Sequence, residues 1–290
     1  MSNTSSLPEF GSKTYVMGIL NVTPDSFSGD GLISEANTVR TALEQAQRFV
    51  ECGADILDIG GESTRPGSSP VTASEELSRV LPVIDALMDS GMKVTISIDT
   101  YKASVARVAL EHGAHWINDI WGLHADPEMA LVAAKAGCPL VLMHNRSKPS
   151  HVELQQRLGG QYLGAGYANL TEDVKNGLLE SVNMALAAGV QKQQIILDPG
   201  IGFGKTVEQN LELINRVDEI KALGYPVLLG PSRKSFIGYT LDLPPAERVE
   251  GTAAACAIGI ARGADIIRVH DVEVMVRVAR MADAIVRHTG

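Results

Sequence analysis

Short apolar runs alternate with longer amphipathic stretches along the whole chain. The runs are rich in Val, Ile and Leu, which is typical of buried β-strands. Between them, apolar residues recur every three or four positions, as they do on one face of a helix. Strands are therefore predicted at residues 15–20, 54–59, 94–98, 116–117, 139–143, 195–197, 227–229 and 266–267.

Eight strand–helix units predict a closed (β/α)8 TIM barrel, an α/β fold. Parallel strands need crossover helices, and closing the sheet removes both of its edges. We expect one barrel domain over residues 15–290 after a flexible N-terminal extension over residues 1–14. An open doubly wound sheet is the alternative, and it would bind a ligand at a single switch point. In a barrel the active site lies at the C-terminal ends of the strands.

Local signals refine this picture at four places. Asp126 followed by Pro127 predicts the start of the fourth helix. Thr206 with a glutamine three residues later has the form of a capping box. Residues 252–261 are apolar and small on every side, so that helix is expected to be buried on more than one face. The polar, glycine-rich segment 146–170 is interpreted as a surface insertion.

Composition narrows the possible partners and compartments. The net charge of −9 argues against nucleic acid and anionic membranes as partners. The N-terminus lacks the pattern of a signal peptide, and no apolar run approaches the length of a membrane span. Cys52, Cys138 and Cys256 lie among small and aliphatic residues. An odd number of such cysteines predicts buried free thiols and a reducing, cytoplasmic location.

Polar side chains follow nearly every predicted strand. A single Asn or Asp there is usually a turn or capping residue. The opposite strand ends show no comparable set, and the carboxyl ends of all strands meet on one rim of a barrel. These residues therefore predict a site on that rim: Asn21, Arg65, Asp99, Asn118, His144, Asp198, Lys234, Arg268 and His270.

The residue types on this rim indicate the ligand. Arg268 and His270 are two residues apart, so both side chains project to the same side, where a guanidinium fork and an imidazole suit a diphosphate. A structural ion pair of Arg268 with a nearby acid is the alternative. Asp99, Asn118 and Asp198 fit a flat heterocycle that carries N–H and NH₂ donors.

Two cationic and aromatic features complete the predicted pocket. Lys234 offers a compact cation to a ring carbonyl or ring nitrogen. The loop after the first strand carries Phe27, two hydroxyls and Asp30 beside glycines, and Phe203 lies in another glycine-bearing loop. The two phenylalanines are expected either to cover an aromatic ligand or to pack as ordinary loop residues.

Several familiar signatures are absent from the sequence. Residues 200–206 lack the glycine spacing of a phosphate-binding P-loop, and no G-x-G-x-x-G opens a helix. There is no zinc-protease helix motif, no C-x-x-C and no G-x-S-x-G nucleophile elbow. The remaining chemistry is to hold a substrate in place and stabilise a leaving anion.

Seven short motifs lie at or directly after the predicted strands: residues 21–28 (NVTPDSFS), 60–67 (GGESTRPG), 98–100 (IDT), 117–119 (IND), 198–205 (DPGIGFGK), 232–236 (SRKSF) and 268–271 (RVHD). The chain resembles the dihydropteroate synthase family of pterin-binding enzymes in folate biosynthesis from about residue 15 to residue 287. The combination of the first two loop motifs is highly specific.

The resemblance implies a transferase that condenses hydroxymethyl-dihydropterin diphosphate with p-aminobenzoate, giving dihydropteroate and diphosphate, with Mg²⁺ as cofactor. It also implies a homodimer and inhibition by sulfonamides. The pterin pocket would comprise Asp99, Asn118, Met143, Asp198, Phe203, Gly230 and Lys234. The diphosphate would bind Asn21, through the metal, together with Arg268 and His270.

The aminobenzoate side would comprise Phe27, Thr64, Pro66 and Ser235, with Arg65 in the second loop and Asp30 in the first. The family's first loop commonly runs Ser-Asp-Gly-Gly, whereas here a glycine precedes Asp30. A catalytic role is expected for Lys234, Arg268, His270, Asp99, Asp198 and Arg65. The alternatives are a pterin-barrel methyltransferase domain, which would not need the arginines and closing loops, and an inactive pterin-binding paralogue, which would have lost pocket residues.

Overall fold

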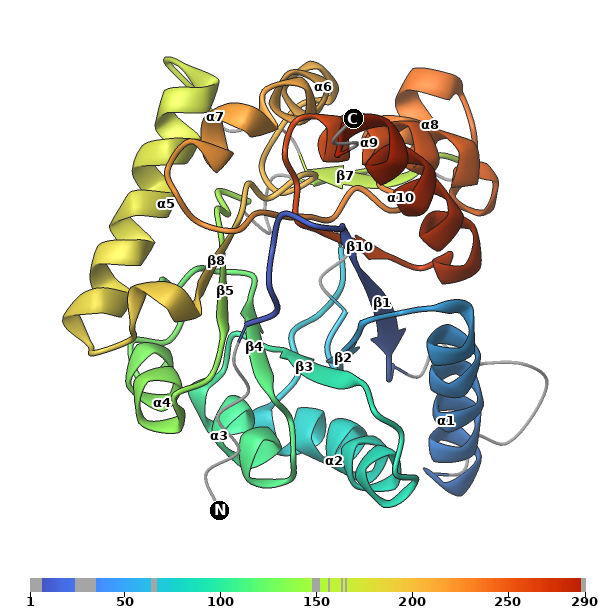
Figure 1. Ribbon diagram of the computed structural model, residues 1–290, viewed down its shortest axis with the longest axis vertical. Helices are drawn as coiled ribbons and strands as arrows, with labels where there is room; N and C mark the ends of the chain where they lie inside the picture. Colours follow the sequence, from blue (N-terminus) through green and yellow to red (C-terminus); the bar gives the residue numbers. More distant parts are fainter. Residues whose placement is uncertain are drawn as a thin grey trace.

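The computed structural model of the chain describes residues 7–23, 35–63, 67–147, 152–155, 157–162, 164 and 166–287. Eight parallel strands form one sheet that is surrounded by helices (Figure 1). Along the sheet the strands follow the order β8-β5-β4-β3-β2-β1-β10-β9. Their bounds are β1 Tyr15–Asn21, β2 Ile56–Gly60, β3 Thr95–Asp99, β4 Trp116–Asp119, β5 Leu140–Met143, β8 Ile195–Asp198, β9 Leu228–Leu229 and β10 Ile266–Val269.

The sheet closes between its first and last strands. A parallel bridge joins Leu197 of β8 to Val227, next to β9, and the Leu197 amide donates to the Pro226 carbonyl at 2.9 Å. Closure satisfies backbone groups that an open edge would leave unpaired. The predicted (β/α)8 barrel is therefore confirmed, and the doubly wound alternative is wrong.

Helices cover the outside of the barrel, with each crossover leading to the next parallel strand. Their bounds are α1 Glu35–Cys52, α2 Ala73–Asp89, α3 Ala103–Glu111, α4 Met129–Ala136, α5 Leu170–Ala187, α6 Val207–Asn215, α7 Val217–Lys221, α8 Ser235–Leu241, α9 Val249–Ala261 and α10 Val272–Val286. Short 3-10 turns span Lys192–Gln194 and Pro245–Glu247.

The inside of the barrel changes from apolar to polar along the strands. Alternate strand residues face the interior. Near the amino ends of the strands these residues form one hydrophobic cluster: Met17, Ile56, Trp116, Val141, Ile196, Leu228 and Ile266. Two positions further along each strand, the residues of the same parity are Ile19, Asp58, Asn118, Met143, Asp198, Gly230 and Arg268. The apolar half fixes the barrel, and the polar half leads to its carboxyl rim.

At the end of the barrel opposite the rim, the chain before β1 packs against the apolar interior, and a buried acid binds the neighbouring backbone. Leu7 and Phe10 pack against the interior apolar cluster, and the backbone amide and hydroxyl of Thr14 both donate to Asp283, each at 2.7 Å. Asp265, which precedes β10 and is 1% exposed, accepts from the Val227 amide at 2.8 Å and from an ammonium on α7 at 2.6 Å. This carboxylate therefore supports the strands far from the polar rim.

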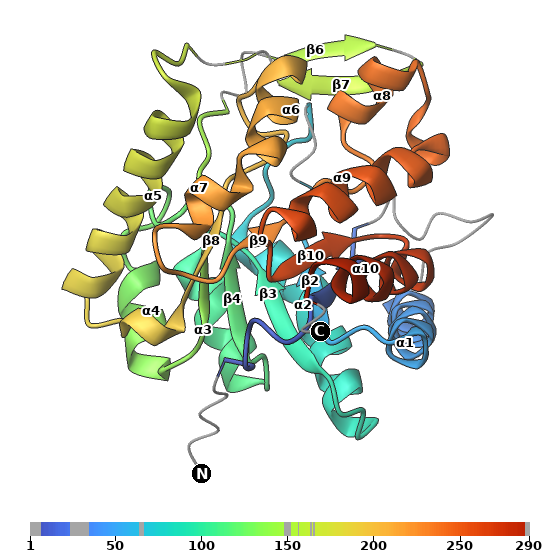
Figure 2. The same cartoon turned by 45° about the horizontal axis from the view of Figure 1, so that its top comes forward.

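Segment 146–170 contains an antiparallel hairpin. Strands β6 (Val152–Gln155) and β7 (Gly159–Tyr162) pair with each other and not with the barrel, and β7 lies beside α8 (Figure 2). The Arg248 guanidinium, 2% exposed, donates to the Leu158 carbonyl at 2.8 Å and so ties the hairpin to the chain before α9.

Some local predictions hold and others do not. The Thr206 capping box is confirmed. Helix α4 starts at Met129 with Glu128 at its N-cap position, so the start predicted at Asp126 lies too early. One carboxylate oxygen of Asp126 still accepts from the Glu128 amide at 3.0 Å, and the other accepts from the amide of Ala103, the first residue of α3, at 2.8 Å. Helix α9 is buried on one side only in the single chain, since Ile258 is 47% exposed.

The cysteines and helices bear on the expected compartment. All three cysteines are free. Cys138 and Cys256 are buried as predicted, but Cys52 is only half-buried because it lies in the last turn of α1. In the part of the chain that the structure describes, no helix combines the length and the apolar character needed to cross a membrane.

Candidate active site

The carboxyl rim of the barrel brings together acids and bases from five strands and the loops after them. Parallel register places Asn21 beside Gly60, Gly60 beside Asp99 and Asp99 beside Asn118. Around the other side, Met143 lies beside Asp198. The rim predicted from the strand ends therefore exists, and it joins residues that lie far apart in the sequence.

Arg268 lies at the centre of the polar side chains. Its Nε donates to Asp58 Oδ2 at 2.5 Å, and its Nη2 donates to Asp99 Oδ2 at 2.5 Å. Arg268 therefore forms the ion pair that was considered as the alternative to diphosphate binding, and two acids share its guanidinium. Burial, the main cause, and the charge of Asp58 raise the pKa of Asp99 to about 7, although Arg268 opposes the shift.

Asp58 belongs to this cluster although its position in the sequence is not a strand end. It lies in the middle of β2, is 0% exposed, and accepts from the Asn118 amide nitrogen at 2.9 Å. A signal for it exists in the sequence, because an aspartate inside the apolar run ILDIG breaks the pattern of a buried strand. Such a residue needs partners that a single strand does not reveal.

Asp198 and Lys234 form a second part of the rim. Asp198, 6% exposed, accepts from the Gly200 amide at 2.7 Å, and burial raises its pKa against the pull of Lys234. Burial lowers the pKa of Lys234 to about 8. The Lys234 ammonium lies 4.5 Å from the centre of the Phe203 ring and donates to a carbonyl in the same loop.

Close approach of this loop depends on one glycine. Gly202 has φ +85°, and a Cβ there would lie 2.8 Å from Lys234 Cδ. A side chain at this position would therefore push the lysine away from the ring. Gly230 lies at the end of β9 and faces both Lys234 and Arg268, since a Cβ built on it would be 3.9 Å from Nζ and 3.8 Å from the Arg268 Cβ.

His270 is held by the neighbouring loop. The Ser232 hydroxyl accepts from the His270 backbone amide at 3.1 Å and lies 3.0 Å from ring Nδ1. These two contacts hold the imidazole beside the loop that carries Ser232. Arg233, with φ +55°, is bound by both oxygens of Asp271 and braces the same two loops. Ser235 follows Lys234 as the first residue of α8.

His144, predicted on the rim, is turned toward a buried lysine. The Lys205 ammonium, 3% exposed, donates to His144 Nδ1 at 3.2 Å and to the carbonyls of Gly200 and Phe203 at 2.9 and 3.1 Å. Burial lowers the pKa of Lys205 to about 7 and that of His144 to about 2. Together they fold the 200–205 loop instead of facing Asp99 and Arg268.

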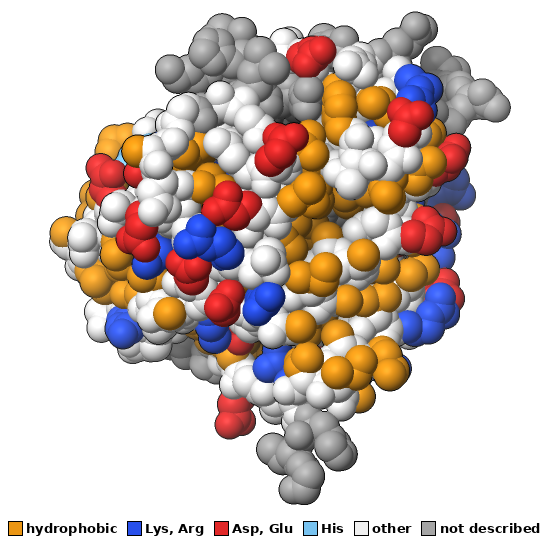
Figure 3. All heavy atoms as spheres, turned by 90° about the horizontal axis from the view of Figure 1, so that it is seen from above, with side chains coloured by type: hydrophobic (Ala, Val, Ile, Leu, Met, Phe, Trp, Pro, Cys, Tyr) orange, Lys and Arg blue, Asp and Glu red, His pale blue; other side chains and the backbone are white. Residues whose placement is uncertain are grey.

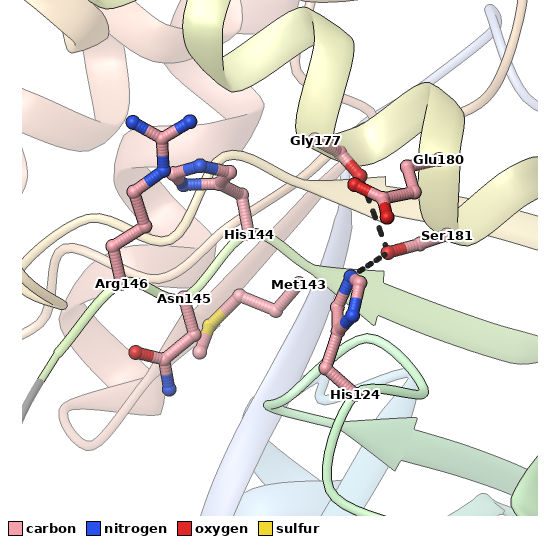
Figure 4. A pocket seen from close by; sticks show the side chains of 8 residues that line it. All are labelled: His124, Met143, His144, Asn145, Arg146, Gly177, Glu180 and Ser181. Carbon is pink, nitrogen blue, oxygen red and sulfur yellow. Dashed lines mark hydrogen bonds between the residues drawn. The ribbon is translucent and has the colours of Figure 1, made fainter. Parts of the chain in front are cut away.

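A separate pocket of about 210 Å³ lies between β5 and α5 (Figure 4). Of the residues predicted for the pterin site, only Met143 lines it, and His124 faces Ser181 at 3.4 Å. His124 and Glu180 are exposed there. Its lining residues are His124, Met143, His144, Asn145, Arg146, Gly177, Glu180 and Ser181. This pocket does not contain the acids and bases of the rim.

The predicted metal ligand Asn21 lies on the carboxyl rim with its side-chain oxygen near that of Asp99. A Cβ on Gly60 would be 3.8 Å from Asn21 Oδ1 and 3.5 Å from Asp99 Oδ2, so both oxygens border the same point of the rim. Among the described residues no three His, Cys, Asp or Glu side chains converge on a possible metal. Mg²⁺ commonly binds through one or two protein oxygens, substrate phosphates and water, so this donor set fits it.

Five predicted residues lie outside the described part of the chain: Phe27, Asp30, Thr64, Arg65 and Pro66. Just before residues 64–66, Glu62 accepts from the Tyr101 hydroxyl at 2.9 Å and from the Lys102 ammonium at 2.5 Å. Lys102 also binds Glu76, which is 1% exposed. The chain that enters this segment is therefore anchored to α2 and to the loop after β3.

Comparison with known proteins adds the family. The sequence profile described as pterin binding enzyme matches residues 17–270. A dihydropteroate synthase of Clostridium beijerinckii is 51% identical over 278 residues, covering 96% of each chain. The chain belongs to the dihydropteroate synthase family.

Solved structures of this family share the fold. A dihydropteroate synthase from Clostridium difficile, crystallised in the presence of pteroic acid, superposes with a TM-score of 0.87 at 47% identity and covers 97% of this chain and 100% of its own. A Yersinia pestis dihydropteroate synthase in a sulfonamide drug complex gives 0.83 at 42% identity, covering 94% of each chain. The chain is thus a transferase of the dihydropteroate synthase family.

The raised pKa of Asp99 predicts that this site lowers the stability of the folded chain by an amount that depends on pH. Between pH 4 and 7 an unfolded chain ionises this carboxyl while the folded chain keeps its proton, so folded-state stability falls as pH rises. Asp99→Asn cannot ionise and should raise the free energy of unfolding more at pH 7.5 than at pH 4.5. Urea denaturation of both proteins at the two pH values measures the difference, and a gain that is the same at both would contradict the raised pKa.

Proposed function

We propose that the chain condenses hydroxymethyl-dihydropterin diphosphate with p-aminobenzoate, releasing diphosphate and forming dihydropteroate for folate biosynthesis. The observation that carries the proposal is the shared rim, on which acids and bases that suit the two halves of the first substrate lie side by side. Membership in the dihydropteroate synthase family supports it. The pterin-barrel methyltransferase and the inactive paralogue are disfavoured, because Arg268 and His270 are both present on this rim.

The acidic part of the rim suits the pterin ring. Asp99, Asp198 and Asn118 present acceptor oxygens to the N–H and NH₂ donors of a flat heterocycle. Lys234 supplies a donor to a ring carbonyl or nitrogen, and its position over Phe203 keeps both beside the ring. The two carboxylates also stabilise the cationic pterin that remains when the diphosphate departs. Met143 and Gly230 complete the walls of the proposed pocket.

The basic part of the rim suits the leaving diphosphate. His270 contributes its imidazole and Arg268 its guanidinium, and each would donate a hydrogen bond to the departing oxygens. Asn21 would hold Mg²⁺, which when bound supplies further positive charge to the diphosphate. Release of Arg268 Nη2 from Asp99 accompanies binding, because pterin donors compete for the same carboxylate.

The second substrate needs little activation. An arylamine is largely neutral near pH 7 and is itself nucleophilic, so no general base is required. Ser235 and the predicted loop residues Phe27, Asp30, Thr64, Arg65 and Pro66 would shape its site and exclude water, which competes with the amine. Sulfonamides, as aminobenzoate analogues, would occupy the same place. The free thiols support a reducing, cytoplasmic location.

The reaction is tested by measuring diphosphate release from the pterin substrate. With Mg²⁺ present, release should require p-aminobenzoate, and dihydropteroate should form in equal amount. A sulfonamide should raise the apparent KM for p-aminobenzoate without lowering kcat. Diphosphate release that is independent of the amine would contradict the proposal, as would transfer of a methyl group from a methylated folate.

Arg268 is expected to act mainly on the leaving group. Arg268→Ala should lower kcat by roughly 10²–10³-fold, the usual effect of removing one donor that stabilises transition-state charge, while pterin binding is partly retained. Because the change leaves two acids without their cation, circular dichroism must first show a folded protein. Arg107→Ala, at an exposed arginine on α3, serves as the control that keeps full activity. An unchanged kcat in Arg268→Ala would remove this role.

The exposed apolar side chains of α9 and α10 support a homodimer. Figure 3 looks onto the side of the molecule with these helices and shows hydrophobic side chains gathered in a band. On the two helices, Ile258 is 47%, Met281 63% and Ile285 68% exposed. Contiguous apolar surface of this kind on a globular protein usually marks an interface. A second copy would also bury the side of α9 that the single chain leaves open.

Charged substitutions on this face test the dimer. Ile258→Glu together with Met281→Glu should shift the chain from twice its monomer mass to one monomer mass in sedimentation equilibrium, because an interface core does not tolerate unpaired carboxylates. Leu131→Glu, at a 59% exposed leucine on α4, is the matched control and should leave the mass unchanged. A wild-type chain that sediments as a monomer at every concentration would contradict the interface.

A further inference from the structure

The buried carboxylate of Asp58 is an acceptor-only group beneath the pterin rim. It is 0% exposed and lies in the second interior layer of the barrel, one layer below Gly60 and beside Ser97 on the next strand. Its Oδ2 accepts from the Asn118 amide nitrogen at 2.9 Å and from Arg268 Nε at 2.5 Å. Its Oδ1 has no hydrogen-bond partner among the described residues. Its two bonded partners, Asn118 and Arg268, are the residues assigned to the pterin and to the diphosphate.

The chemistry of Asp58 decides which atoms its two neighbours present. A carboxylate accepts and does not donate, so the Asn118 side chain must turn its NH₂ group inward. The Asn118 carbonyl oxygen is then directed away from Asp58 and is available to a ring N–H. Arg268 is oriented in a similar way. Its Nε donates to Asp58, so the other end of the guanidinium, where Nη2 donates to Asp99, is directed toward the rim.

The surroundings leave few other ways to fix Asn118. Asn118 is 2% exposed. Among the described residues, its side chain is held by the hydrogen bond that its NH₂ group donates to Asp58. The side chain of an asparagine has two orientations of similar shape, which differ in where the donor and acceptor lie. A carboxylate below it allows only one of them.

We propose that Asp58 is a positioning residue for the pterin site: it fixes the amide of Asn118 and the guanidinium of Arg268 so that an acceptor faces the ring and a donor faces the diphosphate. This inference rests on the proposed function for the identity of the ligand. It assigns to Asp58 a role that is exerted through these two neighbours. A purely structural counter-ion for Arg268 would support the fold without affecting how the ring is recognised.

The decisive variant is Asp58→Asn, which keeps the size of the side chain but adds a donor. The new amide can pair with either orientation of Asn118, so the acceptor is no longer held toward the ring. Calorimetry with hydroxymethylpterin, which lacks the diphosphate, should show an affinity about tenfold weaker than that of the wild type, the effect of one poorly made buried hydrogen bond. The KM for p-aminobenzoate should be unchanged, since its site does not include Asn118.

A matched control separates positioning from stability. Asp265→Asn also alters a buried carboxylate that binds a cation and an amide, but at the opposite end of the barrel. It should lower the melting temperature, as Asp58→Asn does, and leave hydroxymethylpterin affinity within twofold of the wild type. Equal losses of pterin affinity in both variants would mean that destabilisation alone is responsible, and the role of Asp58 would be overturned.

A double-mutant cycle shows whether Asp58 acts through Asn118. If it does, Asp58→Asn combined with Asn118→Ala should bind hydroxymethylpterin no more weakly than Asn118→Ala alone. Losses that multiply would overturn the proposed route, as would a folded Asp58→Asn protein with wild-type affinity.

The same measurements distinguish this inference from the proposed function. A wild-type chain that binds hydroxymethylpterin in an Asp58-dependent way but forms no dihydropteroate would overturn the function and keep the role of Asp58. Dihydropteroate formation with an affinity that does not depend on Asp58 would do the reverse. A wild-type chain that does not bind hydroxymethylpterin would overturn both.

Discussion

One arginine shared by two buried acids organises the site. Arg268 spans the interior of the barrel between Asp58 and Asp99, and Asn118 joins the same cluster through Asp58. Each of these groups would be costly to bury alone, so each depends on the others being in place. Burial raises the pKa of Asp99 to about 7, and the charge of Asp58, which shares the same guanidinium, adds to this rise. This cost is tolerable because a ligand with ring donors relieves it.

The barrel makes this cluster possible by dividing its interior into two halves. The amino half is filled by large apolar side chains that fix strand positions, and the same inward-facing parity continues into polar residues at the carboxyl half. The positions of Asp58, Asn118 and Arg268 are thus set by the packing of Ile56, Trp116 and Ile266 two residues earlier. A rigid apolar base holds the polar groups above it without help from a ligand.

Side-chain contacts also hold the loops at the carboxyl rim in place. Ser232 contacts both the backbone and the ring of His270, Arg233 binds Asp271, and Lys205 binds carbonyls of the loop that carries Phe203. The first two contacts join the loops after β9 and β10, and the Lys205 bonds hold the loop after β8 in its fold. The diphosphate side is therefore supported by neighbours that hold His270 and its loop in place, in the same way that Asp58 is proposed to support the pterin side.

The sequence by itself determined the barrel, because eight strand–helix periods recur in order, and it determined the rim residues, because each follows a strand whose direction is common to all. It marked Asp58 only as a polar residue in an apolar run. The tertiary structure decided that Asp58, Asn118 and Arg268 meet, that His144 turns to Lys205, and that Asp126 also binds the first amide of α3. These outcomes depend on side chains from distant strands and helices, and hydrophobic periodicity records which face is buried but not which neighbour is found there.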